Sequence, residues 1–298
     1  MVMRTIAEIV ETANETHQSI AELMIQQEME ENNVSREAVI DQMKQNLAVM
    51  KAAIKRGSTG EGVQSSTGLT GGDAIKMKKY REKGNTLSGD IMLSGVQAAL
   101  ATNEVNAAMG VVCATPTAGS TGTLPGILTA MTETMQLTEE EELEFLFTAA
   151  LFGMVVANNA MIAGAVGGCQ AEIGSASAMG AAAAVAVKGG TPQQCSEAFG
   201  MAMGNLLGLV CDPVAGLVEI PCVKRNTIGA CNALICADMA LAGIENKIPA
   251  DEVIEAMRQV GVSLPSELRE TGMGGMAATP TGIQMKIRIF GQDVSEEA

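Results

Sequence analysis

The stretch IGSASAMGAAAAVAV at residues 173–187 strongly limits what this chain can fold into, because it carries no charge and consists mostly of very small side chains. A second stretch, LEFLFTAALFGMVVA at residues 143–157, is nearly as apolar. Each runs for 15 residues, whereas a membrane-spanning helix needs roughly 20. The chain also has neither an interfacial belt of aromatic residues nor a Lys/Arg bias between its loops. Both stretches are therefore predicted to be buried helices of a globular protein, with no membrane partner.

The interior of this protein must be built almost without aromatic side chains. Only 2% of the 298 residues are aromatic, with five Phe, one Tyr and no Trp, while Met alone occurs 21 times. Small and flexible side chains favour helices that pack closely together. A hydrophobic content of 47% is enough for a substantial core. The prediction is a mostly α fold in one domain, with amphipathic helices at 1–56 and an active-site core at 57–298.

Helix signals recur along the chain. Residues 6–24 have the three-four apolar spacing of an amphipathic helix, and a second helix is predicted from Ser35 to about Gly57. Capping patterns open three further helices, at Asp73, at Thr138 and at Thr191. Residues 227–243 indicate another buried helix, whereas residues 282–290 fit a strand or a short helix equally well. No convincing run of strands appears.

Net charge and cysteine usage exclude several classes of protein. A formal charge of −15 is unsuited to a phosphate backbone, so no nucleic-acid partner is expected. Seven cysteines are an odd number for a disulfide framework, and no signal-peptide pattern opens the chain. The expectation is a cytoplasmic protein with reduced thiols.

The common catalytic constellations are missing. His17 is the one histidine, and it falls in an amphipathic helix, so neither a Ser-His-Asp or Cys-His site nor a His-rich zinc site can be assembled from this chain. No Walker or dinucleotide-binding motif is present. Two glycine-rich segments, at 57–72 and 114–126, are predicted loops whose backbone N–H groups and hydroxyls suit a carboxylate or a phosphate.

The cysteines fall into two groups. Four lie in apolar or helical context and are interpreted as small buried hydrophobes: Cys113, Cys195, Cys231 and Cys236. Three lie at loops or turns: Cys169, Cys211 and Cys222. Pro213 and Pro221 stiffen the loop that joins the last two, LVCDPVAGLVEIPC at 209–222. Such stiffening suits thiolates that converge on a metal centre, although the spacing matches no compact ligand signature, so a purely structural role stays open.

Several motifs in the same order resemble one known family. They include SSTGLTGGDA, KGNTLSGD, NEVNAAMG, TPTAGSTGTLPG, NNAMIAGAVGGCQAEIGSASAMGAA, GLVCDPVAGLVEIPCVKRN and MAATPTG, and they extend over roughly residues 57 to 282. This chain is similar there to the alpha chain of the iron–sulfur-dependent L-serine dehydratases. It departs at Thr121, where many relatives carry a cysteine that is not a cluster ligand.

The resemblance implies a cofactor, a reaction and a partner. Cys169, Cys211 and Cys222 would hold a [4Fe–4S] cluster with three thiolates, and the fourth iron would act as a Lewis acid. The reaction would eliminate water from L-serine to give pyruvate and ammonia. Relatives carry a second module with a histidine motif, as a separate beta chain or a fused domain, so a beta subunit that supplies the base is expected.

The resemblance and the loop chemistry together suggest which residues bind the amino acid. Lys224 and Arg225 follow Cys222 directly, where a cation favours the thiolate and pairs with a carboxylate; Lys76 is a weaker candidate in a basic helix. The remaining candidates for binding the amino acid are Ser65, Ser66, Thr67, Thr117, Ala118, Gly119 and Ser120.

Three other functions remain open from the sequence. A related cluster lyase would act on L-threonine or L-cysteine, and loops of this kind do not reveal the difference. A pyridoxal-phosphate enzyme would need a lysine for a Schiff base, and no lysine stands in a convincing context for one. A non-catalytic helical scaffold subunit would use its cysteines only for packing.

Overall fold

The computed structural model describes residues 3–291 and is built from helices. Within that range it forms α1 to α13 with short 3-10 and π turns, labelled η1 to η5, and no β-strand. An isolated parallel bridge between Cys211 and Arg269 is the one strand-like pairing in the described part of the chain. The predicted mostly α fold is confirmed.

The helices occupy the following bounds: α1 Ile6–Thr16, α2 Ile20–Asn32, α3 Arg36–Thr59, α4 Asp73–Arg81, α5 Gly89–Ala107, α6 Thr123–Met135, α7 Glu139–Asn159, α8 Gly164–Gly167, α9 Ser175–Val187, α10 Pro192–Gly204, α11 Cys222–Leu241, α12 Ala250–Ser263 and α13 Pro280–Phe290. The short turns are η1 Ala118–Ser120, η2 Gln170–Gly174, η3 Val214–Gly216, η4 Ser266–Leu268 and η5 Gly275–Ala278.

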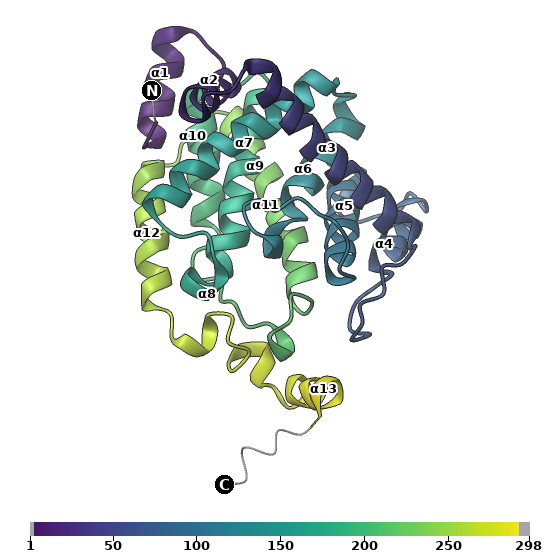
Figure 1. Ribbon diagram of the computed structural model, residues 1–298. Helices are drawn as coiled ribbons and strands as arrows, with labels where there is room; N and C mark the ends of the chain where they lie inside the picture. The colour runs from purple at the N-terminus through teal and green to yellow at the C-terminus, as the bar shows by residue number, and fades with distance from the viewer. Residues whose placement is uncertain (1–2, 292–298) are drawn as a thin grey trace.

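Helix α9 is the centre of the bundle and contains most of the uncharged stretch at 173–187. It packs against α6, α7, α10 and α11, which surround it (Figure 1). Every residue from Ser175 to Val185 is buried. At Gly180, a Cβ atom would lie 2.2 Å from Cδ1 of Ile127 in α6. Small side chains therefore let neighbouring helix backbones approach closely, as the composition predicts.

Helix α7 supplies much of the larger core material. Its N-terminus has the predicted capping box, in which the Thr138 hydroxyl accepts from the Glu141 N–H and the Glu141 carboxylate accepts from the Thr138 N–H. Phe152 lies against Phe199 of α10 with ring centroids 5.3 Å apart. None of the described helices has the length and apolar character needed to cross a bilayer.

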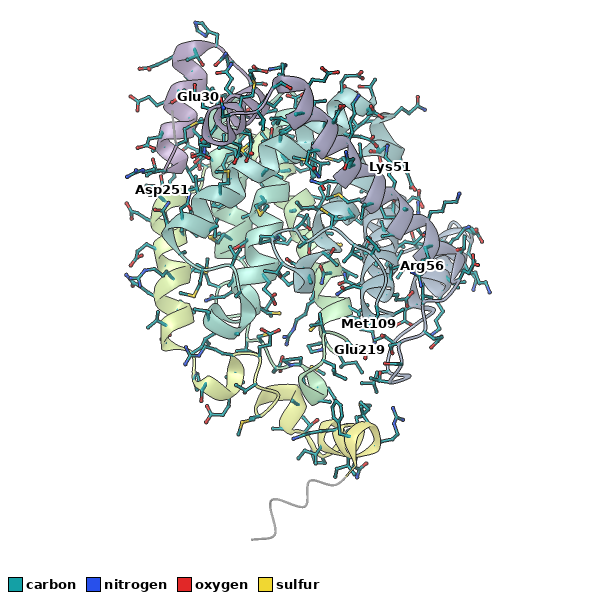
Figure 2. All side chains as sticks on the ribbon, in the orientation of Figure 1. Glu30, Lys51, Arg56, Met109, Glu219 and Asp251 are labelled. Carbon is teal, nitrogen blue, oxygen red and sulfur yellow. The ribbon has the colours of Figure 1, made fainter. Side chains whose placement is uncertain are left out.

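The N-terminal region differs from the prediction in one respect. The stretch at 6–24 is not one helix but α1 and α2, because His17 adopts a left-handed conformation (φ 55°) that ends α1. The Asp251 carboxylate accepts hydrogen bonds from the N–H groups of Ile6 and Ala7, which joins α1 to α12 (Figure 2). Ser35 caps α3 as expected.

Other helix boundaries also move relative to the sequence prediction. Gly72 rather than Asp73 caps α4, and α3 continues two residues past Gly57. Helix α6 begins inside the predicted 114–126 loop, and α11 begins at Cys222 rather than near 227. The ambiguous tail is helical, as α13. The earlier start of α11 places Cys222 at the beginning of a helix.

Candidate active site

Cys169, Glu172 and Cys211 form a compact buried group. The two Sγ atoms and a carboxylate oxygen of Glu172 all lie within 4.8 Å of one another. Cys169 precedes the π turn η2, which continues into α9, so Cys169 and Glu172 are one turn apart on the same helical path. Cys211 reaches them through the bridge to Arg269, in which the Cys211 N–H donates to Leu268 O at 2.8 Å. Two sequence-predicted ligands therefore meet, 42 residues apart in the chain.

Cys222 approaches the same group from the first residue of α11. It is buried, and the charges of Cys169, Glu172 and Arg225 act on its thiol. Cys169 and Cys222 thus both lie where a helical segment begins. All three predicted ligands are brought to one end of the bundle.

Arg225 is held beside the cysteines by its own contacts. Its guanidinium forms an ion pair with Asp212 at 2.7 Å and donates to the backbone oxygen of Val210 at 2.7 Å, and its charge interacts with that of Cys169. Asp212 also accepts from the Met276 N–H at 2.7 Å. Lys224 is exposed. The two adjacent cations therefore differ, because only Arg225 faces the buried group.

The first glycine-rich loop contacts the loop at 209–222 through the buried side chain of Glu219. Both Glu219 oxygens are engaged, one by the Thr67 hydroxyl at 2.8 Å and the other by the Thr70 hydroxyl at 2.7 Å. Ser65 is buried and shapes its own loop by bonding Thr67 and Thr70, while Ser66 is exposed. Glu219 lies at the end of the bundle that carries the site (Figure 2).

The second loop approaches the cysteines directly. The Thr117 hydroxyl donates to Glu172 Oε1 at 2.6 Å. Ser120 is buried, and its hydroxyl donates to the backbone oxygen of Thr115. Gly119 lies so near that a Cβ atom there would be 2.6 Å from Glu172 Oε1. Candidate residues on this loop, including the exposed Ala118, thus border the Cys169 and Cys211 group.

Asn226 joins this loop to the beginning of α11. It is fully buried, and its amide nitrogen donates to Gly119 O at 2.8 Å and to Cys222 O at 3.0 Å. Its oxygen accepts from the Gly122 N–H at 3.1 Å and from the Thr123 hydroxyl at 3.0 Å. One side chain therefore fixes a cysteine relative to the loop beside it.

Burial sets the protonation of the site. The hydrogen bond with Cys169 and then burial raise the pKa of Cys211, and burial followed by the charges of Cys169 and Glu172 raises that of Cys222. Burial raises the pKa of Glu172 to about 7, against the hydrogen bond from Thr117, which lowers it. Metal binding displaces such protons, because coordinated thiols are ionised.

The donor set suits a thiolate-bound metal centre. Thiolates select zinc, Cu(I) or iron–sulfur clusters over hard cations such as magnesium. Ile173 packs against Cys169 and Cys211, with Leu206 and Leu209 at the edge of the same small cluster. Such an apolar lining limits access of water to the sulfur atoms. The residues present therefore fit a centre held by Cys169, Cys211 and Cys222.

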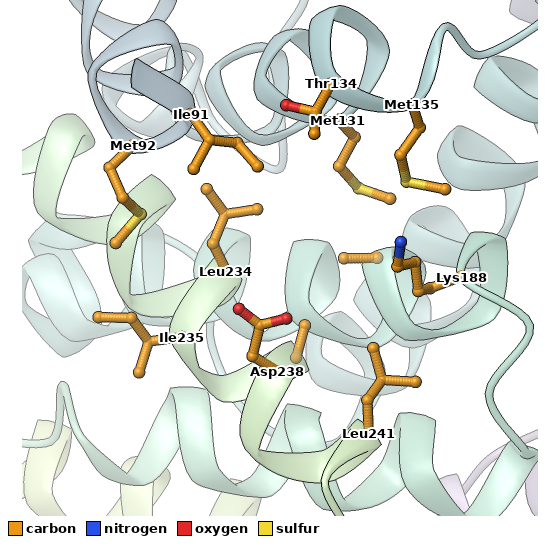
Figure 3. A pocket seen from close by; sticks show the side chains of 12 residues that line it. Ile91, Met92, Met131, Thr134, Met135, Lys188, Leu234, Ile235, Asp238 and Leu241 are labelled. Atoms are coloured by element: carbon orange, nitrogen blue, oxygen red, sulfur yellow. The ribbon is translucent and has the colours of Figure 1, made fainter. Parts of the chain in front are cut away.

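Two cavities elsewhere in the described chain lack this chemistry. An apolar pocket of about 260 Å³ lies between α5, α6, α9 and α11, and Lys188 and Asp238 are the charged side chains of its lining (Figure 3). A second cavity, of about 460 Å³, is lined by Lys76 and Lys224 among others. Lys76 is 77% exposed and pairs with Asp73 at 2.8 Å. Neither cavity is lined by a cysteine.

The other four cysteines behave largely as the sequence indicates. Cys195 and Cys236 are buried, whereas Cys113 and Cys231 are only partly buried. His17 is exposed, and the α1–α2 turn that contains it lies at the opposite end of the bundle from α8, which directly precedes Cys169 (Figure 1). The chain's histidine therefore takes no part in the site.

Comparison with known proteins assigns the chain to a protein family. A family model described as "Serine dehydratase alpha chain" matches residues 15–277. The chain belongs to the serine dehydratase alpha chain family. The "Probable L-serine dehydratase, alpha chain" of Bacillus subtilis is 57% identical over 97% of this chain and 96% of its own length. The "L-serine dehydratase, alpha chain" of Peptoniphilus asaccharolyticus is 41% identical over 96% of this chain and 97% of its own.

A longer relative is also similar. The "L-serine dehydratase 1" of Escherichia coli is 33% identical over 92% of this chain but only 61% of its own length. This alpha chain family member therefore corresponds to part of the Escherichia coli protein, which contains additional sequence.

Four site residues escape the sequence argument: Glu172, Asp212, Glu219 and Asn226. Two had a local signal, since Glu172 is three residues after Cys169 and Asn226 is four after Cys222, spacings that share a helix face. Asp212 and Glu219 had none, because their partners are set by how distant loops meet.

Proposed function

We propose that this chain is the catalytic alpha subunit of an L-serine dehydratase and that Cys169, Cys211 and Cys222 hold a [4Fe–4S] cluster in it. The observation that carries the proposal is the convergence of Cys169 and Cys211 in a buried site of a family member. The relatives' printed names support serine as the substrate.

The reaction removes two groups from serine. The α-proton and the β-hydroxyl leave as water, a carbon–carbon double bond forms, and the aminoacrylate tautomerises to an imine that hydrolyses to pyruvate and ammonia. When bound, the cluster supplies Lewis acidity through an iron without a protein ligand, which makes hydroxide a better leaving group. No net electron transfer is required.

The chain's own residues bind and orient the substrate. The Thr117–Ser120 loop lies beside Glu172, and the Ser65–Thr67 loop approaches the cysteine loop through Glu219. Ser66 makes no hydrogen bond within residues 3–291, so its hydroxyl is free for a substrate carboxylate. Arg225 keeps a positive charge beside Cys169.

A second subunit completes the enzyme in this proposal. The relatives that this chain covers almost fully are named alpha chains, while the Escherichia coli protein is longer. The only histidine of this chain is exposed, and the α1–α2 turn that contains it lies at the opposite end of the bundle from α8, which precedes Cys169 (Figure 1). A beta subunit that supplies the base accounts for both observations.

Iron and sulfide analysis tests the cluster. Anaerobically reconstituted protein is expected to bind four irons per chain, by analogy with a cubane cluster, and Cys211→Ala is expected to lose both iron and pyruvate formation. Cys195→Ala is the matched control, because Cys195 is equally buried but lies in the apolar core. Pyruvate release by iron-free protein together with its partner would contradict the cluster.

Substrate preference is tested separately. The purified two-chain enzyme is expected to turn over L-serine faster than L-threonine or L-cysteine, measured as kcat/KM for each. A preference for either of the other amino acids would replace serine dehydration by the related lyase reaction. An absorbance spectrum typical of pyridoxal phosphate would contradict the proposed chemistry altogether.

A further inference from the structure

The Glu172 carboxylate is the least compensated charge in the site. It is 7% exposed, and its Oε1 atom accepts one hydrogen bond, from the Thr117 hydroxyl at 2.6 Å. Cβ atoms added at Gly119 and Gly164 would lie 2.6 Å and 2.8 Å from its oxygens, so the carboxylate packs closely against the backbone of these two glycines. Its position beside Cys169 and Cys211 directs it into the site.

No cation of residues 3–291 pairs with Glu172. Arg225, the cation beside Cys169, pairs with Asp212 instead. A buried carboxylate is costly unless a positive charge or several hydrogen-bond donors complete it. Glu172 has one hydroxyl donor and no cationic partner within the described chain.

The other acids near the site are differently placed. Asp212 is bound by Arg225 and by the Met276 N–H, and both oxygens of Glu219 hold threonine hydroxyls. Glu270 acts on Glu172 and Cys222 through its charge, but it is only partly buried and lies outside the close group of Cys169, Glu172 and Cys211. Glu172 is thus the buried acid with capacity for a new partner.

We propose that Glu172 binds the ammonium group of the amino acid substrate, an inference that rests on the proposed function of this site. Serine carries one positive charge, and the geometry offers it one buried, unpaired carboxylate next to the thiols. The loop that holds Glu172 through Thr117 also carries the N–H groups of Ala118 and Gly119, which have no hydrogen-bond partner within residues 3–291 and suit the substrate carboxylate. A single side chain thereby selects α-amino acids over other β-hydroxy acids.

Binding measurements with two probes test the inference. L-glycerate has the carboxylate and the β-hydroxyl of serine but a hydroxyl in place of the ammonium. Steady-state kinetics on the reconstituted two-chain enzyme are expected to give a KM for L-serine at least about tenfold below the competitive inhibition constant of L-glycerate. In Glu172→Gln, L-serine affinity is expected to fall about ten- to a hundredfold, as for one charge-assisted hydrogen bond, while L-glycerate affinity changes less than about threefold.

Two further variants keep the test decisive. Glu270→Gln, the comparison carboxylate, is expected to change the preference for L-serine less than Glu172→Gln does. Glu172→Asp retains the charge and is expected to keep the preference for L-serine, with weaker binding; it carries the test if Glu172→Gln does not fold. Iron content of the folded Glu172 variants is expected to match the parent protein.

Several results would overturn the inference. They are equal affinity of the parent enzyme for both probes, equal weakening of both in Glu172→Gln, transfer of the effect to Glu270→Gln, or loss of iron from Glu172→Gln. Failure of the proposed function is distinguishable, because it would appear in the parent enzyme as absence of iron or of pyruvate formation, before any variant is compared.

Discussion

Removal of the Asn226 side chain is expected to destabilise the protein and disconnect the site at the same time. The amide makes four hydrogen bonds while fully buried, to Gly119 O, Cys222 O, the Gly122 N–H and the Thr123 hydroxyl. At a net value of about 1 kcal/mol each, Asn226→Ala is expected to lower the free energy of unfolding by roughly 4 kcal/mol. That is a large part of the 5–15 kcal/mol typical of a folded domain.

Asn232→Ala provides a matched control on the same helix. Asn232 donates to Ser177 Oγ and Ala202 O, both at 2.9 Å, and accepts from Asn205 at 2.8 Å, all within the bundle. Its removal is expected to cost about 2–3 kcal/mol by the same reasoning. Because none of these partners bonds Cys169, Cys211 or Cys222, the folded Asn232 variant should retain iron.

Anaerobic urea unfolding, followed by circular dichroism, measures both losses, and iron analysis of the folded fraction measures the effect on the site. Asn226→Ala is expected to lose iron as well as stability, since Cys222 and the Gly119 loop are no longer tied together. A loss of stability below about 1 kcal/mol, the value of a single such bond, or iron retention equal to that of Asn232→Ala, would refute the reasoning.

Three further outcomes are expected. Gly119→Ala should lower kcat/KM at least about tenfold, because its Cβ would lie 2.6 Å from Glu172 Oε1 and displace the loop; steady-state kinetics measures this, and unchanged kinetics would contradict the packing of the loop. Gly126→Ala should lower the free energy of unfolding by about 1–3 kcal/mol, because its Cβ would lie 2.8 Å from a backbone oxygen of α5; an unchanged urea midpoint would show that α5 and α6 separate easily. Iodoacetamide at pH 8 should alkylate Cys231 before Cys195, because Cys195 is fully buried and burial raises its pKa to about 12; mass spectrometry gives the order, and the reverse order would indicate local opening of the core.

Local sequence signals were sufficient for much of the scaffold. Ser35, Thr138 and Thr191 cap helices as predicted, because each hydroxyl bonds an N–H only three residues ahead. The Ala-rich stretch is the buried central helix because a run of small side chains is favourable only where other helices press against it. The break at His17 was not predictable in this way, since a left-handed histidine has no strong sequence signature.

The sequence by itself determined that this is a mostly helical, tightly packed protein, and its motifs indicated the family and the three loop cysteines. Only the tertiary structure decided that Cys169 and Cys211 meet, that Glu172 lies between the glycine-rich loop and the sulfurs, and that Arg225 pairs with Asp212. The physical reason is separation along the chain. Helix formation depends on residues three or four positions apart, whereas the site depends on contacts between segments tens of residues apart that only the packing of the bundle brings together.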